Sequence, residues 1–297
     1  MPDEVEKYRF EKAQVNHAFN RVAAHYEQHA VLQQTVASRM LERLDLFRLR
    51  PGLILDVGAG TGWAARLLEG RYRKAHVVLC DLAEQMLQNA RHRAPFFFSR
   101  QSFLCADVES LPVGNARVDM IFCNLCLQWC TDLDRVLNHF RRVLRPEGLL
   151  LFSSFGPDTL RELRLSWAEV DAGVHVHRFL DMHDVGDALI RAGLVSPVMD
   201  VEHFTVTYSD VLALLHDLKQ IGATNAAAGR AHGMTGKGAL RALANAYACF
   251  DRGGRLPATY EVVYGHAWAP VAGQRPQDGS TVARFPISQI KRSTNVR

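Results

Sequence analysis

The sequence predicts an α/β protein built on a doubly wound, mostly parallel β-sheet. Short apolar segments alternate with helix-like segments between residues 53 and 153, as expected for parallel strands joined by crossover helices. The polar residues that stand out in this region each follow an apolar segment directly. Parallel strands end at the same edge of a sheet, so these residues are expected to meet in a ligand crevice there.

The spacing of apolar residues places the individual elements. Strands are expected over 53–57, 75–80, 102–105, 118–123, 149–153, 199–208 and 259–268. Helices are expected over 63–68, 82–90, 132–144, 159–170, 183–192, 212–221 and 239–250, and as two amphipathic helices within 11–47, the second over 31–47. Residues 271–297 are polar without periodicity and predict a flexible tail.

Three alternate glycines follow the first apolar segment. Asp56 is the one ionisable residue of that segment, and Gly58, Gly60 and Gly62 come next. Glycine permits a sharp turn and lets a ligand approach the backbone closely. A dinucleotide fingerprint has a glycine at the sixth place, where this chain has Trp63. The turn therefore predicts a nucleotide-type cofactor without a pyrophosphate.

Polar residues also follow the next strands. Asp81 comes about 20 residues after the turn, where a carboxylate can accept from both hydroxyls of a ribose. The alternative for Asp81 is the N-cap of helix 82–90. Asp107 is placed to accept from an adenine amino group, whereas Glu109 is expected to face solvent, and Asn124 follows strand 118–123.

The composition predicts a cytoplasmic protein that binds neither nucleic acid nor membrane. The formal charge of +4 permits an acidic partner, but no run of Lys and Arg is dense enough for a nucleic-acid patch. No apolar run approaches the roughly 18 residues that span a bilayer, and the charged start of the chain is unlike a secretory signal. The six cysteines are therefore expected to stay reduced.

Three of these cysteines form a C-x2-C-x3-C motif at Cys123, Cys126 and Cys130. Such spacing can bind a metal ion, but no second pair of cysteines or histidines completes a ligand set nearby. Free cysteine is commonly buried. Packing is therefore the preferred interpretation, and no metal is expected.

These motifs resemble those of the class I S-adenosyl-L-methionine (SAM) methyltransferases, with matches at 56–62, Asp81, Asp107 and Asn124. Further segments are similar to the malonyl-acyl-carrier-protein O-methyltransferase family of biotin synthesis: 18–26, 124–129, 160–163, 175–179, 218–223, 236–237 and 256–264. The resemblance covers nearly all of residues 12–268. It implies a fold with a seven-stranded, Rossmann-like sheet. It also divides the chain into helices over 1–50 that cover the cofactor, a SAM-binding core over 51–208, a helical substrate lid inserted at 209–257 and a last strand at 258–270.

The resemblance also implies roles for individual residues. SAM would be bound at the strand ends, by Asp56, Gly58, Ala59, Gly60, Gly62, Asp81, Leu82, Met86, Asp107, Val108, Asn124 and Gln128. The methyl group would pass to the free carboxylate of a malonyl thioester on acyl carrier protein. That carboxylate is ionised near pH 7, so no general base is required. It would be held by Tyr26 and a basic residue, for which the candidates are His175, His177, Arg178, Lys219 and Arg230.

An acidic carrier protein would need a basic docking face, to which Arg161, Arg164, Lys237 and Arg241 could contribute. Two alternatives stay open. Another small acid or a quinone-like ring could be the acceptor. A carbon or phenol nucleophile would need a general base, for which His175 could serve. The chain could also be a catalytically silent SAM-fold binding subunit, against which the intact cofactor carboxylates argue.

Two residues depart from the pattern of this family. Ala59 stands where many relatives have Cys, and it keeps the position small. Glu147 stands where Gly is usual after Arg145 and Pro146. Glu147 is compatible with a turn there if its φ is negative.

Overall fold

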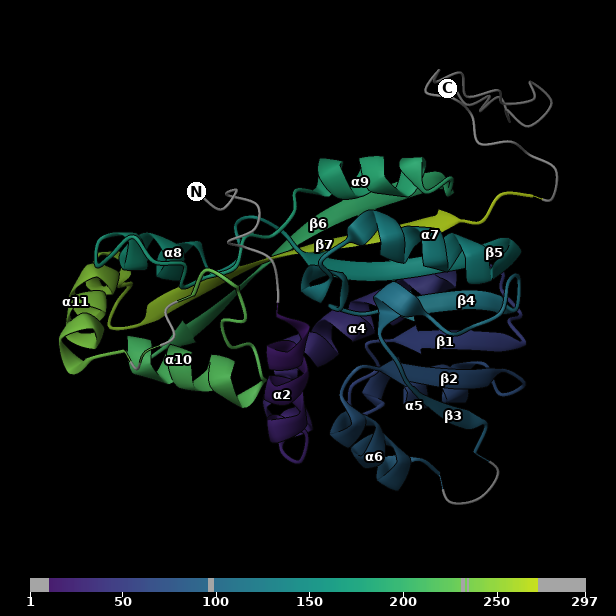
Figure 1. Cartoon of the computed structure of the whole chain (residues 1–297), viewed down its shortest axis with the longest axis horizontal. Helices are drawn as coiled ribbons and strands as arrows, with labels where there is room; N and C mark the ends of the chain where they lie inside the picture. Colours follow the sequence, from purple (N-terminus) through teal and green to yellow (C-terminus); the bar gives the residue numbers. More distant parts are fainter. Residues whose placement is uncertain (1–10, 96–98, 231–232, 234, 272–297) are drawn as a thin grey trace, which may run out of the picture.

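A seven-stranded sheet runs through the molecule, and helices cover both of its faces (Figure 1). The computed structural model describes residues 11–95, 99–230, 233 and 235–271. The strands are β1 (Leu53–Val57), β2 (His76–Asp81), β3 (Gln101–Cys105), β4 (Val118–Cys123), β5 (Leu144–Phe155), β6 (Val195–Tyr208) and β7 (Leu256–Trp268). Their order is β3-β2-β1-β4-β5-β7-β6, and β7 runs antiparallel to both of its neighbours. The predicted doubly wound, mostly parallel sheet is confirmed.

Alternate residues of the central strands feed two hydrophobic cores, one on each face. Ile54 and Met120 belong to one core, whereas Leu55 and Ile121 belong to the other. The first core is completed by α4 (Val31–Arg43), α5 (Trp63–Arg71) and α6 (Glu84–Arg93). The second is completed by α7 (Leu133–Val143) and α9 (Met182–Arg191). Among the described helices, none is long and apolar enough to cross a membrane.

The hairpin of β6 and β7 extends beyond the other strands and carries a third core (Figure 1). This core is formed with α8 (Arg161–Ala168), α10 (Val211–Gln220) and α11 (Lys237–Tyr247). Its buried members include Trp167, Leu214 and Tyr247. The helices of the insertion between β6 and β7 therefore pack mainly on this extension, at the end of the molecule away from β1 to β3.

The observed boundaries differ from the predicted ones where tertiary contacts decide. The first predicted helix is broken after α2 (Lys12–Val22), so that Tyr26 begins a short helix of its own, α3 (Tyr26–His29). Strand β6 begins at Val195 rather than residue 199, because Val195 pairs with Trp268 of β7. The tail predicted for 271–297 lies, apart from Val271, outside the described residues.

Glu147 has a φ of +62°, so the negative φ that would make it compatible with the turn is not found. The backbone is held there because the Glu147 amide donates to Ala269 O at 3.1 Å. The next residue, Gly148, leaves no room for adjustment, since an added Cβ would lie 2.9 Å from Arg145 O. Left-handed backbone costs a residue with a Cβ about 1–2 kcal/mol.

Replacing Glu147 by glycine is therefore expected to stabilise the protein by about 0.5–1 kcal/mol, because relief of this strain exceeds the extra unfolded-state entropy of glycine. Glu147 is exposed, so no packing is lost. Urea unfolding of E147G measures the effect, with E147A as the control that keeps a Cβ. A loss of stability in E147G relative to E147A would show that this position is not strained.

Candidate cofactor and acceptor site

A cavity lies between the carboxyl ends of the central strands and the N-terminal helices, and it contains about 1330 Å³ of space between atoms, part of it open to solvent. Of the residues predicted to bind the cofactor, all but Gly62 line it: Asp56, Gly58, Ala59, Gly60, Asp81, Leu82, Met86, Asp107, Val108, Asn124 and Gln128. Helix α2 adds Lys12, Val15 and Phe19, and the insertion adds Ile221 and Ala223. Strand ends, N-terminal helices and insertion thus surround one space.

The glycine turn can follow its path because its glycines have positive φ, +66° at Gly58, +53° at Gly60 and +75° at Gly62. A Cβ on Gly58 would lie 2.6 Å from Cys126 Cβ, whereas on Gly60 it would meet only Tyr26, at 3.8 Å. Gly60 therefore leaves its backbone open to a ligand. A Cβ on Gly62 would lie 2.9 Å from a methyl of Leu79, so Gly62 serves the packing of α5 instead of lining the cavity.

Asp81, at the end of β2, fastens this turn. Its Oδ2 accepts from the Gly60 amide and its Oδ1 from the Ala83 amide, both at 2.8 Å. The Ala83 contact precedes α6, whose N-cap is Ala83 itself, so Asp81 is not the N-cap of that helix. A carboxylate has acceptor capacity beyond two bonds. Burial raises the pKa of Asp81 to about 6, although the two amide hydrogen bonds act in the opposite direction.

Asp56 is buried in the wall of the cavity, with 1% of its surface exposed. Its Oδ2 has no hydrogen-bond partner among the described residues. Burial, followed by the charge of Asp81, raises the pKa of Asp56 to about 8. A buried carboxylate oxygen without a partner fits a cationic ligand group. Together with the open Gly60 backbone and the Asp81 carboxylate, it fits SAM, which has both a cationic end and a ribose.

Asp107 lies beside a lysine that sequence reasoning missed. Lys12 Nζ is 2.5 Å from Asp107 Oδ2 and 2.8 Å from Glu109 Oε2. Glu109 is 6% exposed and also accepts from the Thr131 amide and hydroxyl, so the expectation that it faces solvent is wrong. Burial acts to raise the pKa of Glu109, but the hydrogen bonds from Lys12 and Thr131 outweigh it and the pKa is lowered. This pairing is what permits its burial.

Aromatic side chains from two parts of the chain line the cavity together. The ring of Phe19 meets those of Tyr26 and Trp129 edge-on, with centroids 6.3 Å and 5.3 Å apart. Burial and the charge of Asp81 raise the pKa of Tyr26 well above its usual value, so its hydroxyl keeps its proton at neutral pH. Tyr26 is thus a hydrogen-bond donor beside the glycine turn.

The predicted basic residues are not brought to this cavity. His175, His177 and Arg178 line a second cavity beside α8. The His175 ring stacks on Trp167 at 3.7 Å, and its Nε2 lies 2.7 Å from Asp171 Oδ1. Burial lowers the pKa of His177 to about 4, so it is neutral at pH 7.

The other two basic candidates lie on the insertion. Lys219 is exposed on α10. Arg230 Nη1 lies 2.9 Å from Glu11 Oε2, so its charge is already paired. Tyr26 is therefore the one member of the predicted acceptor set that lines the cofactor cavity among the residues described.

The cysteine motif places two of its thiols beside this cavity. Cys126 and Cys130 line it, while Cys123 is buried at the end of β4. In the part of the chain that the structure describes, these thiols do not form a group spaced as metal ligands. Hydrogen bonds from Cys123 and Cys130 lower the pKa of Cys126.

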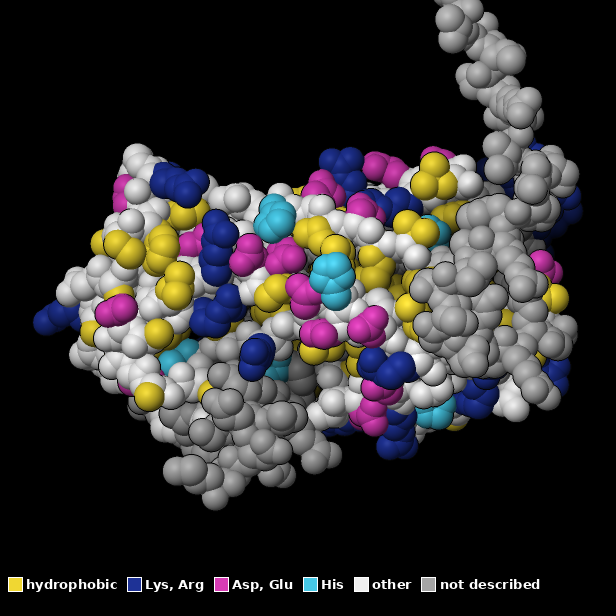
Figure 2. Space-filling view, turned by 90° about the horizontal axis from the view of Figure 1, so that it is seen from above, with side chains coloured by type: hydrophobic (Ala, Val, Ile, Leu, Met, Phe, Trp, Pro, Cys, Tyr) yellow, Lys and Arg dark blue, Asp and Glu magenta, His cyan; other side chains and the backbone are white. Residues whose placement is uncertain are grey.

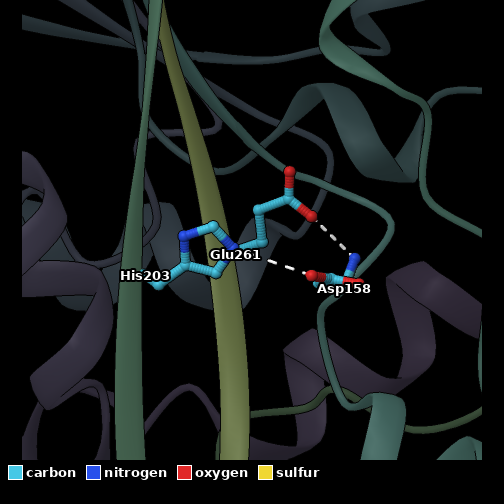
Figure 3. A group of neighbouring side chains, drawn as sticks. All are labelled: Asp158, His203 and Glu261. Carbon is cyan, nitrogen blue, oxygen red and sulfur yellow. Dashed lines mark hydrogen bonds and ion pairs between the residues drawn. The ribbon is translucent and has the colours of Figure 1, made fainter.

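One group of possible metal ligands occurs among the described residues, Asp158, His203 and Glu261 (Figure 3). It lies on β6, β7 and the loop before α8, apart from the cofactor cavity. Glu261 Oε2 accepts from the Asp158 amide at 2.7 Å, and Arg161 lies 3.5 Å from the Asp158 carboxylate. The group is accounted for by these contacts, which fix the loop on the sheet.

Comparison with known proteins agrees with the fold. A family model described as a methyltransferase domain matches residues 55–152. Among solved structures, the YcgJ protein of Bacillus subtilis has a TM-score of 0.56 at 16% identity, covering 78% of this chain and 97% of that one. At this identity the likeness concerns the fold alone.

Relatives of known name match almost the whole chain. It is 48% identical over 283 residues to the malonyl-[acyl-carrier protein] O-methyltransferase of Methylovorus sp. (strain MP688), covering 94% of this chain and 96% of the relative. It is 47% identical over 289 residues to that of Laribacter hongkongensis (strain HLHK9), covering 94% and 97%. The fold and these relatives make SAM the methyl donor. The chain belongs to the malonyl-[acyl-carrier protein] O-methyltransferase family of SAM-dependent enzymes.

Proposed function

We propose that this enzyme transfers a methyl group from SAM to the free carboxylate of a malonyl thioester on acyl carrier protein, the first step toward the pimeloyl chain of biotin. The observation that carries the proposal is full-length similarity to relatives of that name, which extends beyond the cofactor core into the insertion. The cavity supports it, because the N-terminal helices and the insertion contribute to the same space as the cofactor residues.

The carboxylates of the cavity suit the parts of the cofactor. Asp81 would accept from the two ribose hydroxyls, and Asp107 from the adenine amino group. Asp56 lines the space, its Oδ2 has no hydrogen-bond partner among the described residues, and its carboxylate would attract the cationic end. Gly60 keeps the backbone bare where the ligand would lie, whereas Gly58 makes room for Cys126.

The reaction needs little proton chemistry from the protein. Bound SAM supplies an electrophilic methyl group on a positively charged sulfur. A malonyl carboxylate is already ionised near pH 7. The protein's task is therefore to orient that carboxylate and exclude water. Tyr26 can do the first by donating its hydroxyl, and Phe19 and Trp129 contribute to the second as apolar walls.

The basic residues suit the carrier side of the acceptor better than the reacting carboxylate. His175 and Arg178 line the second cavity, and Lys219 is exposed. Lys237 and Arg241 are exposed on α11 and, within the described residues, form no ion pair. Arg161 and Arg164 instead bind their own loop, since Arg161 faces Asp158 and Arg164 donates to Pro157 O. Figure 2 shows several Lys and Arg side chains, with Asp and Glu side chains among them, over the end of the molecule that carries α8 and α11. An acidic carrier could dock at this end.

The proposal is tested by transfer of labelled methyl from SAM to malonyl-carrier protein. Label should appear on malonyl-carrier as an alkali-labile ester and should be absent with acetyl-carrier, which lacks the free carboxylate. Malonyl-coenzyme A and free malonate in parallel reactions define the need for the carrier. No transfer to any malonyl thioester, in protein shown to bind SAM, would refute the acceptor. The rival phenol or carbon acceptors need a general base, and His175 lies outside the cofactor cavity.

SAM affinity is expected to fall at low pH. The pKa of Asp81 is about 6 in the ligand-free protein, and only its ionised form can accept from both hydroxyls. Below that pH binding must release a proton, so affinity should fall by up to about tenfold per pH unit. Asp56 has a pKa of about 8, so SAM affinity should continue to rise with pH up to about that value.

Calorimetric titration from about pH 5 to about pH 8.5 measures this linkage. D81N serves as the control, because an amide cannot ionise and should give weaker binding with a flatter profile. Affinity that is constant or rises toward low pH in the unmodified protein would contradict the role of Asp81.

A further inference from the structure

Two adjacent residues at the start of α2 connect different parts of the molecule. Glu11 faces the insertion, where its Oε2 accepts from Arg230 Nη1 at 2.9 Å and its amide donates to Ala226 O at 3.0 Å. Lys12 faces the cofactor cavity, where it binds Asp107 and Glu109. The first turn of α2 therefore ties the insertion to the cavity wall.

The segment 221–230, called the strap below, packs closely on α2. A Cβ added to Gly222 would lie 3.1 Å from Phe19 Cδ1 and 3.2 Å from Val22 Cγ2. Ile221 and Ala223 line the cofactor cavity. At its other side the strap is held by Asn225, whose Nδ2 donates to Val174 O at 2.5 Å. The strap is thus part of the cavity wall, and its position depends on contacts at both sides.

Glu11 and Arg230 form an ion pair between the start of α2 and the strap. The Arg230 side chain is 15% exposed, and its guanidinium also donates to Ala227 O within the strap. A largely buried guanidinium depends strongly on its carboxylate, because removal of one partner leaves the other charge unpaired. Neither Glu11 nor Arg230 is among the described residues that line the cavity.

We propose that Glu11 and Arg230 are positioning residues, which hold the strap against α2 and thereby close the cofactor cavity on the side of the insertion. They act through Phe19, Ile221 and Ala223, which line that side. Without the pair, cofactor and product should leave faster, although no cofactor contact is removed. Faster loss of a bound malonyl acceptor would also be expected, and that part rests on the proposed function. The effect on cofactor release does not.

The test is the release rate of S-adenosylhomocysteine, followed by the fluorescence of Trp63 and Trp129, which line the cavity. R230M and E11Q should each speed release about 3- to 10-fold, and the double variant should be no faster than the singles, because both remove the same contact. R252M is the matched control, since Arg252 is exposed in the insertion and, within the described residues, forms no ion pair; it should leave release unchanged.

Release in both single variants within about twofold of the unmodified protein, or effects that add in the double variant, would overturn the inference. E11Q keeps the size and polarity of the side chain, so it gives a result even if R230M does not fold. If the variants release S-adenosylhomocysteine faster but the unmodified protein does not methylate malonyl-carrier, the proposed function is refuted and the positioning role stands. If the unmodified protein methylates malonyl-carrier but release from the variants is unchanged, the positioning role is refuted and the proposed function stands.

Discussion

Replacing Asp81 by alanine is expected to weaken SAM binding at least about 100-fold. Hydrogen bonds to a charged group contribute about 1.5–3 kcal/mol each, so losing two ribose contacts costs about 3 kcal/mol or more. The variant also loses the carboxylate that fixes the amides of Gly60 and Ala83, so the glycine turn is less well ordered. Calorimetric titration with SAM measures the loss.

The control for D81A is E84A. Glu84 carries the same charge at the start of α6 but is exposed and does not line the cavity. E84A should bind SAM with an affinity close to that of the unmodified protein. If D81A retained SAM affinity within about threefold of E84A, the ribose role of Asp81 would be excluded and its hydrogen bonds to the Gly60 and Ala83 amides would be its main function.

Replacing Gly58 by alanine is expected to lower the free energy of unfolding by about 2–5 kcal/mol. Two costs combine, since a positive φ costs a non-glycine residue about 1–2 kcal/mol and overpacking costs about 1–3 kcal/mol. The overpacking is specific, because the added Cβ would lie 2.6 Å from Cys126 Cβ. Urea unfolding gives the size of the loss.

The two costs can be separated by removing the clashing side chain. In a C126G background, G58A should cost only the conformational part, about 1–2 kcal/mol. G70A is the matched control in α5, where an added Cβ meets nothing within 4 Å, and it should stabilise the helix by about 0.5–1 kcal/mol. An equal loss for G58A with and without Cys126 would mean that the steric contact is unimportant.

The fold and the meeting of the candidate cofactor residues in one cavity follow from local sequence. Strand β1 has the predicted bounds, and the residues that follow β1, β2 and β4 meet because parallel strands end at one edge. The signal is short-range there: an apolar segment, a glycine turn and a polar residue. Strand β6 is less well predicted, because its start depends on pairing with β7, which is far away in the sequence.

The side of the cavity that α2 forms could not be predicted in the same way. Lys12 meets Asp107 across 95 residues of sequence, and no spacing rule joins them. The burial of Glu109 could not be foreseen, because its half-buried partner, Lys12, lies far from it in the sequence. The helical spacing of Val15 and Phe19 signals an apolar face, but not that this face covers a ligand site.

The acceptor side shows the limit of reasoning from residue type. His175 and Arg178 have the right chemistry for a carboxylate, yet the chain places them beside Trp167 and α8, in a different cavity. Arg230 has it too, but its charge is satisfied by Glu11. Which basic residues serve a site depends on tertiary placement. Tyr26 was predicted from the family resemblance of residues 18–26, and the structure places it next to the glycine turn.

The central claim is that one cavity, between the strand ends and α2, holds the methyl donor with its ribose at Asp81. A crystal structure of the protein with S-adenosylhomocysteine tests it most directly. The expected result is a ribose whose hydroxyls both donate to Asp81, an adenine beside Asp107, and an amino-acid end at the Asp56 side of the glycine turn. A nucleoside bound elsewhere, or a ribose without contact to Asp81, would contradict the claim.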